Sequence, residues 1–277
     1  MRYTVEHETV YSYEAPVVVS QQLMHLTPRA LPWQNPEAHS LVVDPAPGEV
    51  QTREDYFGNP VTQVLIAAPH ARLSVTARTT VSVEARTGPG TLGSSRSAEP
   101  AQFLYESPHV DWFRELVDYA APSFPAGRGA AESALDLMRR IHADFAFDPT
   151  ATSVSTPLRE VLKKRRGVCQ DFAHFMAGCL RSQGHPARYV SGYILTEPPP
   201  GKPRLVGADA SHAWVSVHVP GQGWLDLDPT NDCIVSDEHI TLAWGRDFSD
   251  VTPMRGVILG GGEQTLEVKV TVTPLAA

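Results

Sequence analysis

Short segments with alternating hydrophobic and polar positions make up the first part of the chain. In the clearest segment, residues 73–83, one parity carries Leu73, Val75, Ala77, Val81 and Val83. A strand with one buried and one solvated face has this period of two. Clusters of Pro, Gly and Asn separate the segments, and a further pair of strands is expected on either side of residues 55–60. These patterns predict an antiparallel β domain over residues 1–90, with a turn at 55–60 that could reach a neighbouring domain.

A change in the period of the hydrophobic pattern marks the start of a second part of the chain. Residues 87–100 are small, polar and rich in Gly and Pro, as expected of a linker. We place the domain boundary there and assign residues 91–129 to the linker and a lead-in helix. Residues 130–277 are predicted to form a separate core.

The sequence of this core predicts helices first and strands afterwards. Apolar residues at helical spacing indicate helices at 130–145, about 156–165 and about 169–182. The second of these has an N-cap signal at Thr156 and an end signal at Gly167. Alternating residues then indicate strands at about 187–195, 211–219, 223–227 and 266–272. This order is typical of an α+β fold, in which helices pack on an antiparallel sheet.

Composition narrows the classes of partner and the cellular compartment. With 277 residues, 42% of them hydrophobic, the chain can bury a sizeable core. Its formal net charge of -8 gives no positive excess to attract nucleic acid or anionic lipid, so we expect neither as a partner. The three cysteines are too few and too irregularly spaced for a disulfide framework, which favours a reducing compartment. Residues 1–16 lack the apolar run of a signal peptide or membrane span, so we expect a cytoplasmic location.

Cys169 lies at a position where a thiolate would be stabilised. It begins the predicted helix 169–182, where free backbone N–H groups and the positive end of the helix dipole favour an anion. A backbone N–H at the same place could hold the oxyanion of a tetrahedral intermediate. A cysteine in apolar surroundings more often only packs, and we assign that role to Cys179 and Cys233.

His212 and an aspartate are expected to be neighbours. His212 begins the predicted strand 211–219, and the turn at 220–223 reverses the chain, so the far end of the next strand returns beside it. A carboxylate there could orient the imidazole and stabilise its charged form, which is the arrangement of a catalytic triad. Asp226 and Asp228 share the same strand parity, so spacing does not choose between them.

Other charged or ligand-like clusters have simpler interpretations. The basic run at 163–166 fits the solvated carboxyl end of a helix, where positive charge is favourable. Cys169, His174 and Cys179 are spaced by five residues, which scatters them around a helix and does not suit zinc, and the chain has no CxxC pair. A calcium loop of the D-x-D-x-D-G type is also missing. We therefore predict no metal and no cofactor.

Four short segments follow one another along the chain: GVCQDFAH at 167–174, ARYVSGY at 187–193, SHAW at 211–214 and DPTN at 228–231. In sequence and in order they resemble the bacterial transglutaminase-like cysteine peptidase family. Residues 239–251 further resemble the bacterial branch, and residues 3–83 resemble its amino-terminal β domain. A single tetrapeptide would be weak evidence, but the resemblance covers nearly the whole chain in the family's order.

The resemblance implies a papain-like, transglutaminase-like core with three catalytic residues. In it Cys169 is the nucleophile, His212 the general base and Asp228 the orienting carboxylate. It thereby selects Asp228 over Asp226, which the spacing alone left open.

Two further residues match motif positions of the family. Gln170 and Trp214 are therefore candidates for substrate binding or for the oxyanion site. Papain-type enzymes carry a Gln six residues before the nucleophile, but this chain has Lys163 there. The second oxyanion donor must come from elsewhere.

The combined expectation is a cysteine-dependent acyl-transfer enzyme that acts on a peptide or protein. Because no feature announces an amine site, we predict that water resolves the acyl-enzyme, as in a peptidase or amidase. An amine acceptor, as in a transglutaminase or amide-forming acyltransferase, is the alternative. A protein-binding module that keeps the fold without turnover is an alternative of another class. The sequence does not specify an oligomeric state.

Overall fold

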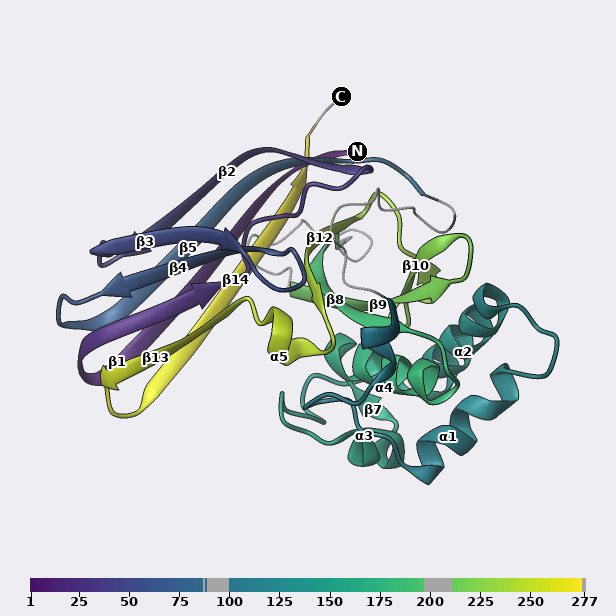
Figure 1. Ribbon diagram of the computed structural model, residues 1–277. Helices are drawn as coiled ribbons and strands as arrows, with labels where there is room; N and C mark the ends of the chain where they lie inside the picture. Colours follow the sequence, from purple (N-terminus) through teal and green to yellow (C-terminus); the bar gives the residue numbers. More distant parts are fainter. Residues whose placement is uncertain (87, 89–99, 197–210, 276–277) are drawn as a thin grey trace, which may run out of the picture.

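The computed structural model describes residues 1–86, 88, 100–196 and 211–275. It has two parts that lie side by side, a large antiparallel sheet and a compact unit of helices packed on a smaller sheet (Figure 1). The predicted α+β fold, a papain-like core preceded by an antiparallel β domain, is confirmed. Most of the predicted linker at 87–100 lies outside the described residues.

The large sheet is organised around one long strand. Its members are β1 (Arg2–Met24), β2 (Gln34–Asp44), β3 (Glu49–Glu54), β4 (Pro60–Ile66), β5 (His70–Val83), β13 (Met254–Gly260) and β14 (Gln264–Pro274). The first half of β1 pairs with β5 and β14, and its second half pairs with β4 and β13. The register shifts between Ser12 and Val17, where the pairing passes from one set of neighbours to the other.

The alternating residues of β5 form one buried face, as the sequence predicted. All five apolar residues of one parity, Leu73 to Val83, are buried. Leu73, Val75 and Ala77 pack in a core within the sheet domain. Val81 and Val83 instead join the large core shared with the helical unit. The two parts of the chain are therefore joined by a continuous hydrophobic core.

The carboxyl end of the chain corrects the predicted domain boundary. The predicted core at 130–277 extends too far, because β13 and β14 pair with β1 and complete the large sheet of the other domain. The alternation at 266–272 correctly predicted a strand. Alternation specifies a half-buried strand but not its pairing partner, so the sequence placed this strand in the wrong sheet.

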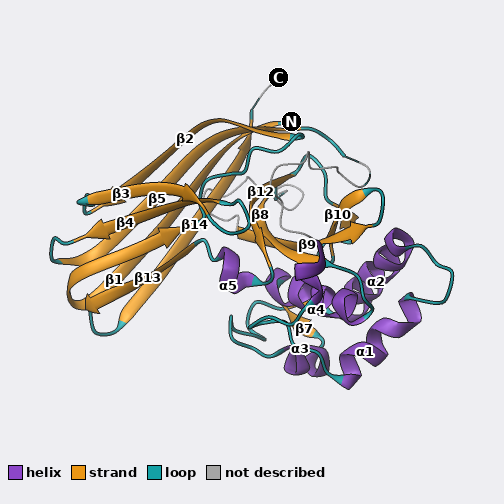
Figure 2. Cartoon of the chain, viewed as in Figure 1, coloured by secondary structure: helices purple, strands orange, loops and turns teal. Residues whose placement is uncertain are grey.

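The helical unit surrounds one central helix. Its helices are α1 (Arg114–Ala120), α2 (Ala130–Asp144), α3 (Leu158–Lys164), α4 (Cys169–Ser182) and α5 (Phe248–Val251), with short 3₁₀ turns at Pro100–Leu104 and Ala121–Ser123. Its sheet has the order β11 (Cys233–Ile234), β10 (Gly223–Asp228), β9 (Ser211–Val219), β8 (Ala187–Ile194) and β12 (His239–Gly245). A small parallel pair joins β6 (Ala146–Phe147) to β7 (Arg166–Gly167). Helix α4 packs on β8 and β9, and α1, α2 and α3 pack on α4 (Figure 2).

Most of the predicted elements of this unit are confirmed, with two corrections. Helix α3 begins after Pro157 rather than after Thr156, and it ends at Arg165, which has a φ of 50°, rather than at Gly167. Strand β12 was not predicted. All of its residues are buried, including the polar His239 and Thr241 that alternate with Ile240, Leu242 and Trp244, so the short alternation in its sequence was not recognised as a strand.

Two buried amide side chains of the amino-terminal domain bind the backbone of β12. Gln34 accepts a hydrogen bond from the N–H of Thr241 at 2.7 Å and donates one to its carbonyl at 2.8 Å. Asn59 does the same with Trp244, at 2.9 Å in both directions. The prediction that the turn at 55–60 reaches a neighbouring domain is therefore confirmed, since this turn fixes β12 in place.

Candidate active site

Cys169 is the first residue of α4 and is held there by the acid two residues later. The Asp171 carboxylate accepts hydrogen bonds from the Val168 N–H and the Thr152 hydroxyl, both at 2.7 Å. Burial raises the pKa of Asp171, and these two hydrogen bonds oppose the rise. A Cβ on Gly167 would lie 2.5 Å from an Asp171 carboxylate oxygen, so glycine is required beside it. The motif around the cysteine thus fixes the position of the thiol.

Replacing Asp171 with alanine is expected to lower the free energy of unfolding by about 1–3 kcal/mol, because two partly buried donors lose their acceptor. The alkylation of Cys169 should also slow, since the first turn of α4 loses its anchor. Urea denaturation and timed iodoacetamide labelling measure the two effects. Asp148→Ala is the control, because the Asp148 side chain caps the exposed turn at Thr150 and otherwise pairs with the exposed Arg166, without contacting Asp171. Equal labelling rates in the two variants would contradict this role.

His212 lies between the thiol and a buried carboxylate. Its Nε2 is 2.7 Å from the Asp228 Oδ2, and the ring also hydrogen-bonds to the Cys169 thiol. Because Nε2 is engaged by Asp228, Nδ1 is the ring nitrogen that faces Cys169. The structure therefore brings together the three residues that the sequence selected, from the start of α4, the start of β9 and the end of β10.

The Asp228 carboxylate is fully buried and surrounded by donors. Its Oδ1 accepts the backbone N–H groups of Thr230 and Asn231, at 2.9 and 3.2 Å. Its Oδ2 accepts from His212, from the Asn231 amide at 2.7 Å and from His239 Nε2 at 3.1 Å. Burial by itself would raise the pKa of Asp228, but these hydrogen bonds outweigh it and hold the pKa well below its ordinary value.

The same contacts favour the charged form of His212. Burial lowers the pKa of this imidazole, but the hydrogen bonds with Asp228 and Cys169 outweigh burial and raise the pKa to about 10. At neutral pH the ring is therefore an imidazolium placed between a carboxylate and a sulfur atom. This arrangement can stabilise a thiolate.

The second candidate aspartate lies in a different cluster. Asp226 forms an ion pair with Arg86 at 3.0 Å, and both side chains are nearly buried. The buried Arg188 is also close enough to interact with its charge. Asp226 makes no contact with His212 among the described residues, so the geometry separates the two aspartates that strand parity could not.

The two substrate-binding candidates have different environments. The side chain of Gln170 donates to the Val154 carbonyl at 3.4 Å on the protein surface, beside Cys169. Trp214 is fully buried among aromatic residues, and its indole N–H has no partner within the described chain. A Cβ on Gly192 would lie 2.4 Å from the indole, so this ring packs tightly against the backbone. Trp214 therefore packs in the interior beside His212, with the two ring centroids 6.2 Å apart.

The other two cysteines differ from Cys169. Cys179 is fully buried on α4, and burial raises the pKa of its thiol. Cys233 is half-buried, and burial together with the nearby Asp228 raises the pKa of its thiol to about 12. Both are therefore protonated at neutral pH, in agreement with the packing role assigned to them.

One group of side chains in the described part of the chain could hold a metal ion. His212, Asp228 and His239 each offer one ligand atom, and these atoms lie within 4.8 Å of one another. The same three atoms are already joined by hydrogen bonds. His174, considered above as a zinc ligand, is instead buried and accepts a hydrogen bond from the Phe248 N–H.

Three contributing residues were not identified from the sequence as parts of the site. Asp171 and Asn231 lie inside the motifs that were recognised, and their spacing from Cys169 and Asp228 was the available signal. His239 begins the recognised segment 239–251, but its distance from Asp228 depends on how β12 packs, so its sequence spacing did not place it in the site.

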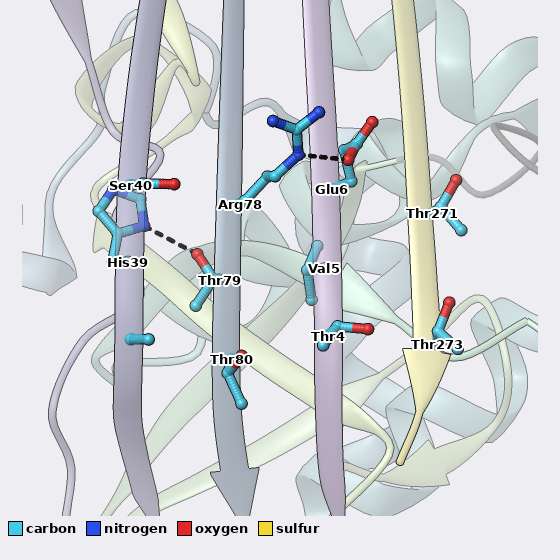
Figure 3. Close-up of a pocket in the computed structure, with 11 residues that line it drawn as sticks. Thr4, Val5, Glu6, His39, Ser40, Arg78, Thr79, Thr80, Thr271 and Thr273 are labelled. Carbon is cyan, nitrogen blue, oxygen red and sulfur yellow. Dashed lines mark hydrogen bonds and ion pairs between the residues drawn. The ribbon is translucent and has the colours of Figure 1, made fainter.

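A separate hollow of about 520 Å³ lies on the outer face of the large sheet, beside the Arg78–Glu6 ion pair (Figure 3). Its lining contains none of Cys169, His212 and Asp228, so it is not the candidate active site.

Comparison with known families identifies the class of protein. Residues 3–82 match the bacterial transglutaminase-like N-terminal region, and residues 109–229 match the transglutaminase-like superfamily. An uncharacterized protein of Mycobacterium tuberculosis is 40% identical over 99% of this chain and 93% of its own length. The chain therefore belongs to the transglutaminase-like superfamily, in the branch with the bacterial amino-terminal domain.

More distant relatives have been given functional names. A protein-glutamine gamma-glutamyltransferase of Pseudomonas aeruginosa is 41% identical over 97 residues, which is 34% of this chain and 14% of that protein. The crystal structure of a proposed cysteine protease from Cytophaga hutchinsonii matches with a TM-score of 0.78 and 19% identity, covering 100% of this chain and 91% of that one. This second match shows the shared fold. Within the described residues, no helix has the length and apolar character needed to cross a membrane.

Proposed function

We propose that the protein is a cysteine peptidase or amidase that hydrolyses an amide bond of a peptide or protein. The observation that carries this proposal is the hydrogen-bonded chain from the Cys169 thiol through His212 to the buried Asp228. Such a chain activates a thiol for attack on a carbonyl carbon. Membership of the transglutaminase-like superfamily supports acyl transfer as the class of reaction.

In the first half of the reaction, the Cys169 thiolate, whose proton already lies on His212 Nδ1, attacks the carbonyl carbon. The resulting oxyanion can be stabilised by the free N–H groups at the start of α4. The carbon–nitrogen bond then breaks, and the imidazolium gives its proton to the leaving amine. A thioester between Cys169 and the acyl group remains, while Asp228 keeps the ring oriented through Nε2.

In the second half, water attacks the thioester and His212 takes one of its protons. The carbon–sulfur bond breaks, the acid is released, and the Cys169 thiolate is restored beside the His212 imidazolium. A primary amine in place of water would give an amide product by the same steps. The name of the Pseudomonas aeruginosa relative favours this second candidate, transglutamination, and both outcomes use the same three residues.

A defined peptide library, incubated with and without a primary amine, distinguishes the two reactions. We expect fragments that have gained one water, and the same fragments when the amine is present. Mass spectrometry reads both products, and Cys169→Ala provides the blank. Products that carry the amine and appear only with it would establish the transferase instead.

Cysteine labelling tests whether the site is catalytic at all. A thiolate at Cys169 should react rapidly with iodoacetamide near neutral pH, and His212→Ala should slow the reaction strongly. A protein-binding module with an inert thiol would show neither property. Slow and equal labelling of all three cysteines would therefore exclude the proposed enzyme.

A further inference from the structure

His239 approaches the triad from a strand that the amino-terminal domain holds in place. It is the first residue of β12, whose backbone is bound by Gln34 and Asn59. The His239 ring is 4% exposed and lies edge-on to Trp214, with ring centroids 5.3 Å apart. Its Nε2 is 3.1 Å from the Asp228 Oδ2, the same oxygen that accepts from His212.

His239 has a single hydrogen-bond partner in the site. Its Nδ1 is buried and has no hydrogen-bond partner within the described chain. A carboxylate oxygen only accepts, so the nitrogen that faces Asp228, Nε2, must donate. Asp228 Oδ2 therefore receives an imidazole N–H from His212 and a second one from His239.

The second histidine is not needed to hold the carboxylate in position. The Asp228 Oδ1 is already fixed by the backbone N–H groups of Thr230 and Asn231. The donation from His239 falls on Oδ2, where it competes with His212 for the negative charge of the same oxygen. Its main effect is therefore on the strength of the hydrogen bond between Asp228 and His212.

We propose that His239 is a positioning residue that acts through Asp228: as a second imidazole donor to Oδ2, it limits how strongly the carboxylate holds the proton on His212. This inference rests on the proposed function of the site. A proton held too strongly on His212 would be given up slowly to the leaving amine, so His239 keeps the imidazolium an effective acid. The amino-terminal domain contributes indirectly, because it holds β12 and hence His239.

Other titratable groups face the same site. The Cys169 thiol approaches from α4, and the Cys233 thiol approaches Asp228 from β11. The phenol of Tyr189, on β8, lies near Cys169 and is fully buried. Neither Cys233 nor Tyr189 donates to Oδ2 among the described residues, so His239 is the second titratable donor there besides His212.

The rate of Cys169 alkylation by iodoacetate, measured against pH, tests the inference. This anionic reagent reacts best while His212 is charged, so the rate falls when the imidazolium loses its proton. In His239→Leu the competing donor is lost, and we expect this alkaline fall to move about one unit to higher pH. In His239→Gln the amide nitrogen occupies the place of Nε2, and the profile should stay close to that of the wild type.

Two more variants keep the test decisive. His239→Asn carries an amide too short to reach Oδ2, so it should shift like His239→Leu and replaces that variant if the latter does not fold. His218→Gln, at the far end of β9, is the matched control and should not shift. If the pH at which the labelling rate falls is unchanged or lower in both His239→Leu and His239→Asn, the inference is overturned, whatever their absolute labelling rates. If wild type and His212→Ala label alike, the proposed function itself fails.

Discussion

Replacing Cys169 with alanine is expected to lower the rate of acyl transfer by about 10⁴-fold or more. The sulfur forms the covalent bond of the acyl-enzyme, and no other described thiol lies beside His212. The fold should persist, because Cys169 is partly exposed and packs only at the edge of the core. Activity on a cleaved peptide and thermal unfolding measure the two properties separately.

Cys233→Ala is the matched control for this experiment. Cys233 is also a partly exposed thiol, and it pairs with Asp228 across β10 and β11 without contacting the His212 ring. We expect most of the activity to remain. Full activity in Cys169→Ala, or equal losses in both variants, would show that Cys169 is not the nucleophile.

Replacing Asp228 with asparagine is expected to lower the acyl-transfer rate by about 10³- to 10⁴-fold. Both carboxylate oxygens act only as acceptors, toward His212, His239 and Asn231 on one side and toward two backbone N–H groups on the other. Either orientation of the new amide would therefore direct an N–H group at other N–H groups. The His212 ring would lose the partner that fixes its orientation and charge.

The same substitution is expected to lower the free energy of unfolding by about 3–5 kcal/mol, because it breaks a buried charge pair. The folded pKa of Asp228 lies below its ordinary value of 3.8, so its contribution is present above that pH and is lost as the pH falls further. The folded pKa of His212 is raised from 6.5 to about 10, so its contribution is complete below 6.5 and is lost as the pH rises toward 10.

The difference in unfolding free energy between wild type and Asp228→Asn should therefore be largest between pH 3.8 and 6.5. Urea denaturation at about pH 5 and about pH 9 would show it. Asp226→Asn is the control on the same strand: it disturbs the Arg86 ion pair but should leave the activity of the folded protein nearly unchanged. A larger loss of activity in Asp226→Asn than in Asp228→Asn would contradict the assignment of Asp228.

Local sequence signals predicted much of the site because much of it is local. The helix start at Cys169 follows from the apolar stripe of α4 and its flanking residues, and the hairpin of β9 and β10 follows from the turn between them. These two features placed the thiol at a helix terminus and His212 beside a strand-end acid. The choice between Asp226 and Asp228 needed the family resemblance, and the geometry now explains it, since only Asp228 reaches the imidazole.

Other features depend on contacts between residues far apart in the chain. The pairing of β14 with β1 joins residues near opposite ends of the sequence, and alternation cannot encode that partner. Strand β12 is buried on both faces, although its sequence alternates Ile240, Leu242 and Trp244 with polar or small residues, so the alternation did not reveal that its second face is covered. Trp214 matched a motif position, but its complete burial became visible only once β8, β9 and β12 were packed together.

The sequence by itself determined the class of fold, the helix that carries Cys169 and the two strands that carry His212 and Asp228. Periodicity, turns and helix ends depend on nearby residues, so they can be read along the chain. The tertiary structure alone decided that the last strands complete the first domain and that His239 reaches Asp228. Both depend on which surfaces pack together, and packing follows from the burial of apolar area over the whole molecule rather than from any local pattern.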